Sequence, residues 1–244
     1  MMVSVCIATY NGEKYLRQQI ESILPQLSKE DEIVISDDCS TDRTVEILRE
    51  FNDERIRIFE NESNRGVVEN FENAIKQSTQ EYVFLSDQDD VWEPNKVDTI
   101  KQLLQTYDFV SHNAEIINDE GVKQGADYFT IRKTKYGYLN NLWKMGYLGC
   151  CMAFKRKCLS DILPFPKGIL WHDMWIAAIL HLEYKGTISK RCLINYRRHD
   201  SNLSTSSEKS EYSLFFKIKY RSVMLYHSLC RYWKNLHGRG GCIS

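Results

Sequence analysis

Apolar and polar positions alternate with two different periods over the first hundred residues. Short runs rich in apolar residues have the length and composition of buried strands, at 3–8, 32–36, 55–59 and 82–85. Apolar residues recur at helical spacing in the intervening segments, at 13–24, 41–51, 67–75 and, after the last run, 97–104. Ser40 or Thr41 is expected to cap the second of these helices. The alternation predicts an α/β fold with a mostly parallel sheet and helices on both faces.

The pattern changes after about residue 107. Residues 107–200 contain aromatic residues and short apolar pieces, which predict added antiparallel strands and loops. We therefore expect one domain over 1–200, with halves at about 1–106 and 107–200. Residues 201–210 are polar and rich in Ser and Thr, and they predict a loop or linker. The last segment, 211–244, predicts a helix over 211–236 with apolar residues along one side, at 214, 218, 225, 229, 232 and 236.

Three carboxylates follow the strand predicted at 82–85. Asp87, Asp89 and Asp90 stand within four residues, where their charges repel unless a positive group lies between them. A hard divalent cation, Mg²⁺ or Mn²⁺, is the natural partner of such oxygen ligands. The alternative is an acidic turn before the helix that opens near Glu93.

Other polar residues also stand at predicted strand ends. Thr9, Tyr10 and Asn11 follow the first strand, and Asp37 and Asp38 follow the second. Open parallel sheets bind ligands outside the carboxyl ends of their strands. These residues are therefore expected to meet the acids in one polar site.

Composition excludes some classes of protein. The 244-residue chain has a formal net charge of -1, so it lacks the overall positive field that would attract nucleic acid. Residues 212–239, however, carry cations and aromatic residues without any acid. A helix of this kind fits an anionic membrane surface. The alternative is packing of its apolar side on its own domain or on a second subunit.

The cysteines and the ends of the chain point to a cytoplasmic setting. The eight cysteines form no Cys-x-x-Cys pair and are typical of reduced thiols. We expect no signal peptide and no membrane-spanning segment, because Met1 leads directly into a strand and no apolar run approaches about 20 residues. The expected location is the cytoplasm, with peripheral attachment to the inner face of the cell membrane through 211–237 as an option.

Four motifs in order give the chain a family resemblance. They are Val3–Gly12, Ile33–Asp42, Asn64-Arg65-Gly66 before a helix, and Ser86-Asp-Gln-Asp-Asp-Val-Trp92, followed later by His172-Asp173. Together they resemble a family 2 glycosyltransferase with the GT-A fold, over roughly residues 2–200. The residues around the acids and the His-Asp pair are most similar to those of rhamnosyltransferase-type members.

The resemblance implies roles for the acids. Asp89 would be the metal ligand, Asp87 would help through the ribose or a bound water, and Asp90 would be a supporting acid or the direct ligand. His199 resembles a late histidine that some members place on the metal or the diphosphate, the alternative being a surface histidine. The implied cofactor is Mn²⁺ or Mg²⁺.

The resemblance also implies a catalytic base. Asp173 matches the family's acceptor-side carboxylate, and a helix dipole at this position is expected to keep it ionised. The alternative is a helix-capping Asp. His172 stands where Glu is commoner, and it would orient the acceptor or share the proton.

The remaining matches concern the nucleotide and the acceptor. Thr9, Tyr10 and Asn11 would lie over the base and ribose, Asp38 would contact the nucleobase or cap a helix, and Arg65 would contact the diphosphate or simply be solvated. The segment 149–152 would form the floor of the acceptor site.

The implied activity is metal-dependent, inverting transfer of a hexose or deoxyhexose from a nucleotide diphosphate sugar to a saccharide acceptor, which would be lipid-linked in surface polysaccharide (O-antigen or capsule) synthesis. Rhamnose from a dTDP-sugar is the first candidate and UDP-sugars are the second. The alternatives are a non-catalytic saccharide-binding or scaffolding protein and a metal-dependent sugar nucleotidyltransferase.

Overall fold

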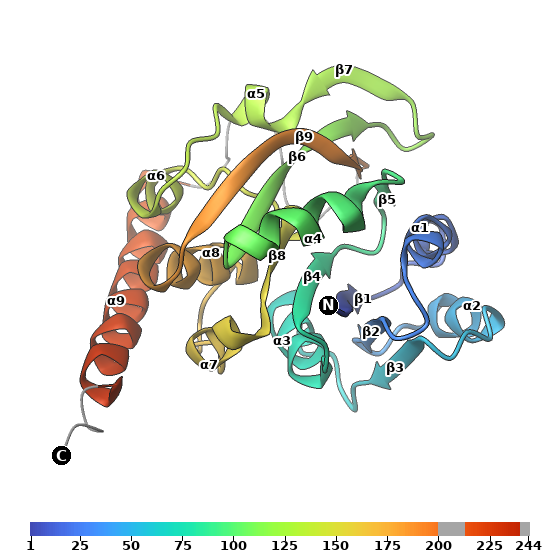
Figure 1. Cartoon of the computed structure of the whole chain (residues 1–244), viewed down its shortest axis with the longest axis horizontal. Helices are drawn as coiled ribbons and strands as arrows, with labels where there is room; N and C mark the ends of the chain where they lie inside the picture. The colour runs from blue at the N-terminus through green and yellow to red at the C-terminus, as the bar shows by residue number, and fades with distance from the viewer. Residues whose placement is uncertain (200–212, 240–244) are drawn as a thin grey trace.

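The computed structural model describes residues 1–199 and 213–239, so the expected linker at 201–210 lies outside the described residues. One mixed sheet forms the centre of the molecule, with strand order β3-β2-β1-β4-β8-β6-β9-β5 and β7 beside β6 (Figure 1). The strands are β1 (Val3–Thr9), β2 (Glu32–Asp37), β3 (Ile56–Glu60), β4 (Tyr82–Ser86), β5 (Val91–Trp92), β6 (Phe109–Ile117), β7 (Lys123–Asp127), β8 (Met152–Lys155) and β9 (Gly186–Arg197).

The first half of the chain builds the parallel part of the sheet. β1 pairs in parallel with both β2 and β4, and β3 continues the set beside β2. From the second half, β8 enters antiparallel between β4 and β6. The mostly parallel first half and the added antiparallel strands are therefore confirmed. Both halves contribute strands to one sheet.

Two hydrophobic cores cover the two faces of this sheet. Alternate residues of one strand face opposite cores, as Val5 and Cys6 do in β1. Helices α1, α2 and α4 pack on one face, and α3, α7, α8 and α9 on the other. The helices are α1 (Leu16–Ile23), α2 (Thr44–Glu50), α3 (Val67–Gln77), α4 (Lys96–Thr106), α5 (Tyr128–Arg132), α6 (Tyr138–Trp143), α7 (Leu159–Ile162), α8 (His172–Glu183) and α9 (Leu214–Arg239), with 3-10 turns η1 (Leu24–Gln26), η2 (Gly149–Cys151) and η3 (Arg156–Cys158).

Two helix starts differ from the prediction. α1 begins at Leu16, three residues after the expected start, and α2 begins at Thr44. The predicted cap of α2 by Ser40 or Thr41 is wrong, because Asp42 accepts the Thr44 N–H at 2.9 Å instead. The Ser40 hydroxyl donates to Asp37 Oδ1 at 2.6 Å.

The orientation of α9 also differs from one of the two expectations. The helix packs on its own domain through Met224, Ser228, Arg231 and Asn235. Its predicted apolar side is left exposed, so packing of that side on the domain is wrong; Leu229 is 45% exposed. Arg231 explains the difference, because its guanidinium donates to backbone oxygens that end α7, including that of Asp161 at 2.6 Å.

No helix among the described residues combines the length and apolar character that crossing a membrane requires. The cysteines that the structure describes, seven of the eight, are free thiols.

Candidate active site

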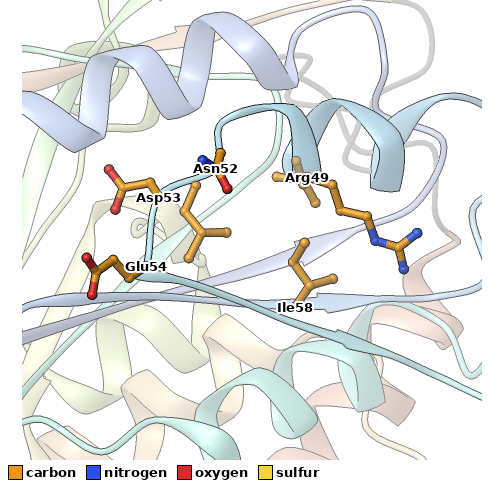
Figure 2. A pocket seen from close by; sticks show the side chains of 7 residues that line it. Arg49, Asn52, Asp53, Glu54 and Ile58 are labelled. Carbon is orange, nitrogen blue, oxygen red and sulfur yellow. The ribbon is translucent and has the colours of Figure 1, made fainter.

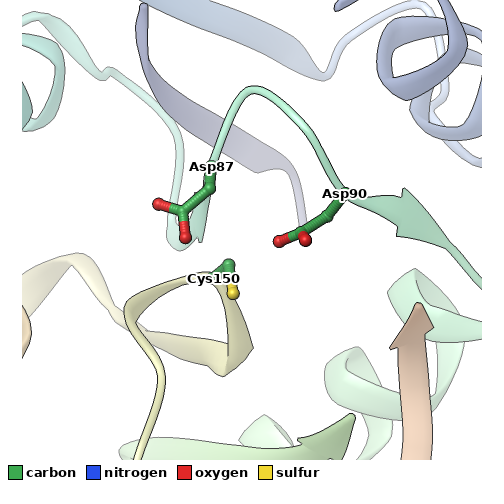
Figure 3. A group of neighbouring side chains, drawn as sticks. All are labelled: Asp87, Asp90 and Cys150. Atoms are coloured by element: carbon green, nitrogen blue, oxygen red, sulfur yellow. The ribbon is translucent and has the colours of Figure 1, made fainter. Parts of the chain in front are cut away.

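The loop after β4 carries the three acids, and two of them point toward one cysteine. A carboxylate oxygen of Asp87, one of Asp90 and the Cys150 Sγ all lie within 4.8 Å of one another (Figure 3). Asp90 is buried, and its Oδ1 accepts the backbone N–H of Arg197 at 2.9 Å. Its Oδ2 is buried as well but has no hydrogen-bond partner among the described residues. Such an oxygen is costly unless a cation or a donor completes its surroundings.

Asp89 turns away from this pair. Its Oδ2 lies 2.9 Å from Nε2 of His199, whose ring lies 4.8 Å from that of Tyr15. The His199 side chain is only 11% exposed, so His199 is not a solvated surface histidine. The four predicted metal ligands thus form two pairs. Asp87 pairs with Asp90 within the loop after β4, and Asp89 of the same loop pairs with His199, which follows β9.

Arg197, at the end of β9, holds the acid loop in place. Besides its N–H bond to Asp90, its guanidinium donates to the backbone oxygen of Asp89 at 2.9 Å. The same group donates to the backbone oxygen of Asp119 and to Oε1 of Gln18, each at 2.7 Å. One buried side chain therefore connects the loop to α1 and to the turn between β6 and β7.

A buried lysine lies beneath the acids. Lys96 is 2% exposed; its Nζ donates to the Cys150 backbone oxygen at 2.9 Å and lies 3.9 Å from the centre of the Trp92 ring. Burial lowers the pKa of Lys96 to about 8, so it is still mostly charged at pH 7. Its charge offsets part of the repulsion among the acids. The sequence reading missed Lys96, although it stands four residues before Ile100 on the predicted buried stripe.

The acidic groups suit a hard divalent cation. Burial, together with the charges of Asp89 and Asp173, raises the pKa of Asp87 to about 7. Burial and the same kind of repulsion also raise the pKa of Asp90. A bound cation would favour the ionised form of both carboxyls. Burial raises the pKa of the Cys150 thiol, and a protonated sulfur is a poor ligand for Mg²⁺ or Mn²⁺, so we do not count Cys150 among the metal ligands.

Asp173, the second residue of α8, supplies a carboxylate from another element. The helix N-cap is Trp171 and makes no side-chain capping bond, so the alternative in which Asp173 is the cap is wrong. Its Oδ1 accepts the N–H of Met174 at 2.7 Å. We expected the helix dipole to favour ionisation, but burial outweighs it and raises the pKa of Asp173 to about 6. This carboxyl is mostly ionised at pH 7 and is a stronger base than an ordinary Asp.

His172 lies next to this carboxylate as a neutral imidazole. Its ring stacks on Phe71 with centroids 3.9 Å apart, and burial lowers its pKa to about 3. It therefore cannot act as a charged acid near neutral pH. Its Nε2 is buried without a hydrogen-bond partner among the described residues. Of its two expected roles, this favours orienting an acceptor group over sharing the proton.

The turn η2 lies between the two sets of catalytic candidates. A Cβ atom on Gly149 would lie 2.7 Å from Nε2 of His172 and 3.4 Å from Cβ of Asp173. The next residue, Cys150, faces Asp87 and Asp90. The acids after β4 and the start of α8 thus lie on either side of this turn. The role of 149–152 as the floor of the acceptor site stays a prediction.

The loop after β1 is fixed by side chains from neighbouring strand ends. Thr9 is buried, and its hydroxyl donates to Asp37 Oδ1 at 2.8 Å. The N–H of Tyr10 donates to Gln88 Oε1 at 2.9 Å, which ties this loop to the acid loop. Asn11 has a positive φ of 47, and its side chain accepts the Thr41 N–H at 2.8 Å. The Tyr10 ring is 48% exposed. The roles of Thr9, Tyr10 and Asn11 over a base and ribose stay predictions.

Asp38 organises the start of α3. Its Oδ1 accepts the N–H of Arg65 at 2.8 Å, and its Oδ2 accepts the N–H of Gly66 at 2.7 Å. Both carboxylate oxygens therefore hold the Asn64-Arg65-Gly66 loop, and Gly66 takes a φ of 83 that suits glycine. The Arg65 side chain is exposed beside this loop. Roles for Asp38 on the base and Arg65 on the diphosphate stay predictions.

A separate depression lies at the outer edge of the sheet. It is lined by α2, β3 and the loop between them, where Asp53 and Glu54 stand opposite Arg49 (Figure 2). None of the candidate site residues lines it, and Arg49 already pairs with Glu60. This depression is therefore separate from the candidate active site.

The chain is similar in sequence to known glycosyltransferases. The sequence model described as glycosyl transferase family 2 matches residues 4–163. The dTDP-rhamnosyl transferase RfbG of Shigella flexneri is 27% identical over 240 residues, 90% of this chain and 78% of RfbG. The UDP-Glc:alpha-D-GlcNAc-diphosphoundecaprenol beta-1,3-glucosyltransferase WfgD of Escherichia coli is 29% identical over 167 residues; the match covers 68% of this chain and 64% of WfgD.

A solved structure shares the fold. Staphylococcus aureus TarS 1-349 in complex with UDP-GlcNAc has a TM-score of 0.71 and 22% identity, over 92% of this chain and 66% of the TarS chain. The expected GT-A fold is thereby confirmed. With the family match extending over most of the chain, from β1 through the acid loop to α7, the chain belongs to glycosyl transferase family 2.

Proposed function

We propose that this family 2 glycosyltransferase transfers a hexose or deoxyhexose from a nucleoside diphosphate sugar to a saccharide acceptor, with inversion at the anomeric carbon, during assembly of a surface polysaccharide. Rhamnose from a dTDP-sugar is the first candidate donor, and a UDP-sugar is the second. RfbG and WfgD, whose names describe a dTDP-rhamnosyl and a UDP-glucosyl transferase, support both.

One observation carries the proposal. Two kinds of carboxylate meet at η2: an acid cluster at the carboxyl end of β4 and a lone base at the amino end of α8. Transfer of a sugar needs both, because the leaving diphosphate gains charge while the acceptor hydroxyl loses a proton. A non-catalytic saccharide-binding protein has no use for three desolvated carboxyls of raised pKa.

The residues of the chain divide the work of one displacement. Asp173 accepts the proton of the acceptor hydroxyl as that oxygen bonds to the anomeric carbon. The bond from this carbon to the diphosphate oxygen breaks, and the nucleoside diphosphate leaves. A single displacement by one base inverts the anomeric configuration. The neutral ring of His172 can hold the acceptor through its unpartnered Nε2.

Mg²⁺ or Mn²⁺ would be held by one of the two pairs into which the predicted ligands divide, Asp89 with His199 or Asp87 with Asp90. The cation, when bound, would neutralise the charge that develops on the leaving diphosphate. Arg197 holds the acid loop through the Asp89 backbone oxygen, and Lys96 holds the turn η2 through the Cys150 backbone oxygen.

We expect dTDP or UDP to stabilise the protein against heat only when Mn²⁺ or Mg²⁺ is present. A nucleotide at about 100 times its dissociation constant stabilises a fold by roughly 2.7 kcal/mol, which is a readable shift. The measurement is a thermal-unfolding series with UDP, dTDP and GDP, each with Mn²⁺, with Mg²⁺ or with EDTA. GDP serves as the matched control of equal charge.

This series and a product assay separate the alternatives. If no nucleotide shifts the transition with either cation, the result supports the non-catalytic alternative. If the protein releases inorganic diphosphate from a nucleoside triphosphate and a sugar 1-phosphate, it is a nucleotidyltransferase. Release of nucleoside diphosphate with an acceptor sugar supports the proposal.

We expect Gly149→Ala to slow transfer about 10- to 100-fold while nucleotide binding is kept, because the added methyl would displace the His172 ring next to Asp173. Steady-state rates and nucleotide-dependent thermal shifts measure the two effects. In the double variant with His172→Ala the clash is removed, so its rate should equal that of His172→Ala alone. If Gly149→Ala lowers the rate of His172→Ala as much as it lowers that of the unchanged enzyme, a clash with the His172 ring is not the cause.

A further inference from the structure

The surface formed by α6 and α9 combines exposed aromatic side chains with an excess of positive charge. Nearly all large apolar residues on the outer side of α9 are exposed; we call them the exposed stripe, and they are Leu214, Phe215, Ile218, Leu225, Tyr226, Leu229, Trp233 and Leu236. The residues that pack on the domain, such as Met224 and Arg231, lie on the other side of the helix. The stripe is therefore not part of the domain's core.

A second element, distant in sequence, continues this surface. α6 runs beside α9 (Figure 1), and the Tyr138 hydroxyl lies 2.7 Å from the Ser228 hydroxyl. The Arg221 guanidinium lies 4.9 Å from the centre of the Trp143 ring. On α6, Leu139 is 73% exposed and Trp143 is 72% exposed. Two elements with fixed mutual contacts thus present one apolar surface.

The charge on these two segments has a single sign. Neither 128–144 nor 213–239 contains an acidic residue, although the whole chain has 33 acids against 32 cations. The cations of the two segments are Arg132, Lys133, Lys135, Lys144, Lys217, Lys219, Arg221, Arg231, Lys234 and Arg239. The rest of the molecule is correspondingly acidic. A surface on which only positive charges gather is complementary to a negatively charged partner.

We propose that the exposed stripe of α9, together with Leu139 and Trp143 of α6, docks on the surface of an anionic lipid bilayer. Aromatic and aliphatic side chains would enter the headgroup boundary, and flanking lysines such as Lys144, Lys219 and Lys234 would face the lipid phosphates. A second copy of the chain fits less well, because two like-charged faces would repel each other.

This docking would place the active site near the membrane. α8, which begins with His172 and Asp173, packs against both α6 and α9. An acceptor carried on a lipid could therefore reach Asp173 without leaving the bilayer. That consequence rests on the proposed function, whereas binding to the bilayer itself does not.

The test uses the whole chain and vesicles of two compositions. Flotation with phosphatidylcholine vesicles should leave the protein unbound, and vesicles that contain phosphatidylglycerol as well should carry it upward. The triple variant Lys144→Gln, Lys219→Gln, Lys234→Gln should lower the partition coefficient about 100-fold. Trp143→Ser with Trp233→Ser should also weaken binding, which a purely electrostatic attraction would not show.

A matched control removes the same charge elsewhere. Lys29, Lys76 and Lys157 are exposed and each pairs with an acid, so their change to Gln should leave partition unchanged. Equal loss in this control, or no binding to anionic vesicles, would overturn the proposal. So would a dimer in solution that the two Trp→Ser changes dissociate without any vesicle binding. Nucleotide-dependent thermal shifts, recorded in parallel, report separately on the donor site.

Discussion

Asp173→Asn is expected to reduce sugar transfer by at least about 100-fold, because general bases contribute roughly 10²- to 10⁴-fold to rate. The amide has nearly the same shape as the carboxylate but cannot accept the acceptor's proton. The Asp173 carboxylate accepts its hydrogen bond from Met174 within the start of α8, and not from the donor loops after β1 and β2. Metal-dependent nucleotide binding should therefore survive the change.

The pH dependence of the rate gives a second readout for Asp173. Its pKa is raised to about 6, and only the ionised form can act as base. kcat/KM should therefore fall about tenfold per pH unit as pH drops below this value. The residual activity of Asp173→Asn should lack this dependence.

A control on the same helix separates chemistry from folding. Glu183→Gln, at the far end of α8, makes the same change of charge away from η2 and should leave the rate unaltered. Normal turnover by Asp173→Asn would remove Asp173 as the base. Loss of nucleotide binding in that variant would show that the change disturbs the fold instead.

Asp89→Ala is expected to remove the metal-dependent part of nucleotide binding. Loss of a supporting group alone weakens metal sites 10- to 100-fold, so loss of a direct ligand should cost at least about 100-fold. Asp89 is the acid of the loop that contacts His199, the nitrogen donor of the predicted set. Calorimetric titration of the chosen nucleotide into the protein measures the effect, once with Mn²⁺ in the buffer and once with EDTA in its place.

Asp98→Ala provides the matched control, because Asp98 is an exposed acid on α4 close in sequence to the loop. It should leave both titrations unchanged. Unchanged affinity in Asp89→Ala would place the cation with Asp87 and Asp90, whose oxygens converge with Cys150. Asp90→Asn would then produce the loss expected here for Asp89.

The sequence predicts the position of the acids well, because strand period and parallel pairing decide which residues end at the same edge of the sheet. It does not predict in which direction each side chain of the loop residues 87–90 points. Asp89 turns toward His199 and Asp90 toward Cys150 because of Arg197, a contact that spans more than a hundred residues. No local pattern encodes such a contact.

The misreading of α9 has a physical cause of a different kind. Apolar residues at helical spacing normally mark the buried side of a helix. In α9, Arg231 and Asn235 bind carbonyl and carboxylate oxygens on the domain, and these polar contacts fix the inward side. Lys96 is the converse case, because its position on the apolar stripe of α4 indicates a buried cation, and a buried cation needs a polar partner such as the Cys150 oxygen.

The contacts of Arg197 bear on how the protein is made. The donor-side motifs from Val3 to Trp92 lie within the first 92 residues, yet the loop that carries their acids is held by the side chain of Arg197. As a nascent chain leaves the ribosome, the amino-terminal half emerges with its acids unrestrained. The donor half therefore does not carry every contact that shapes its own acid loop. When acceptor halves are exchanged between relatives, in evolution or in the laboratory, the new half must supply an arginine at the end of β9 that fits the recipient's loop.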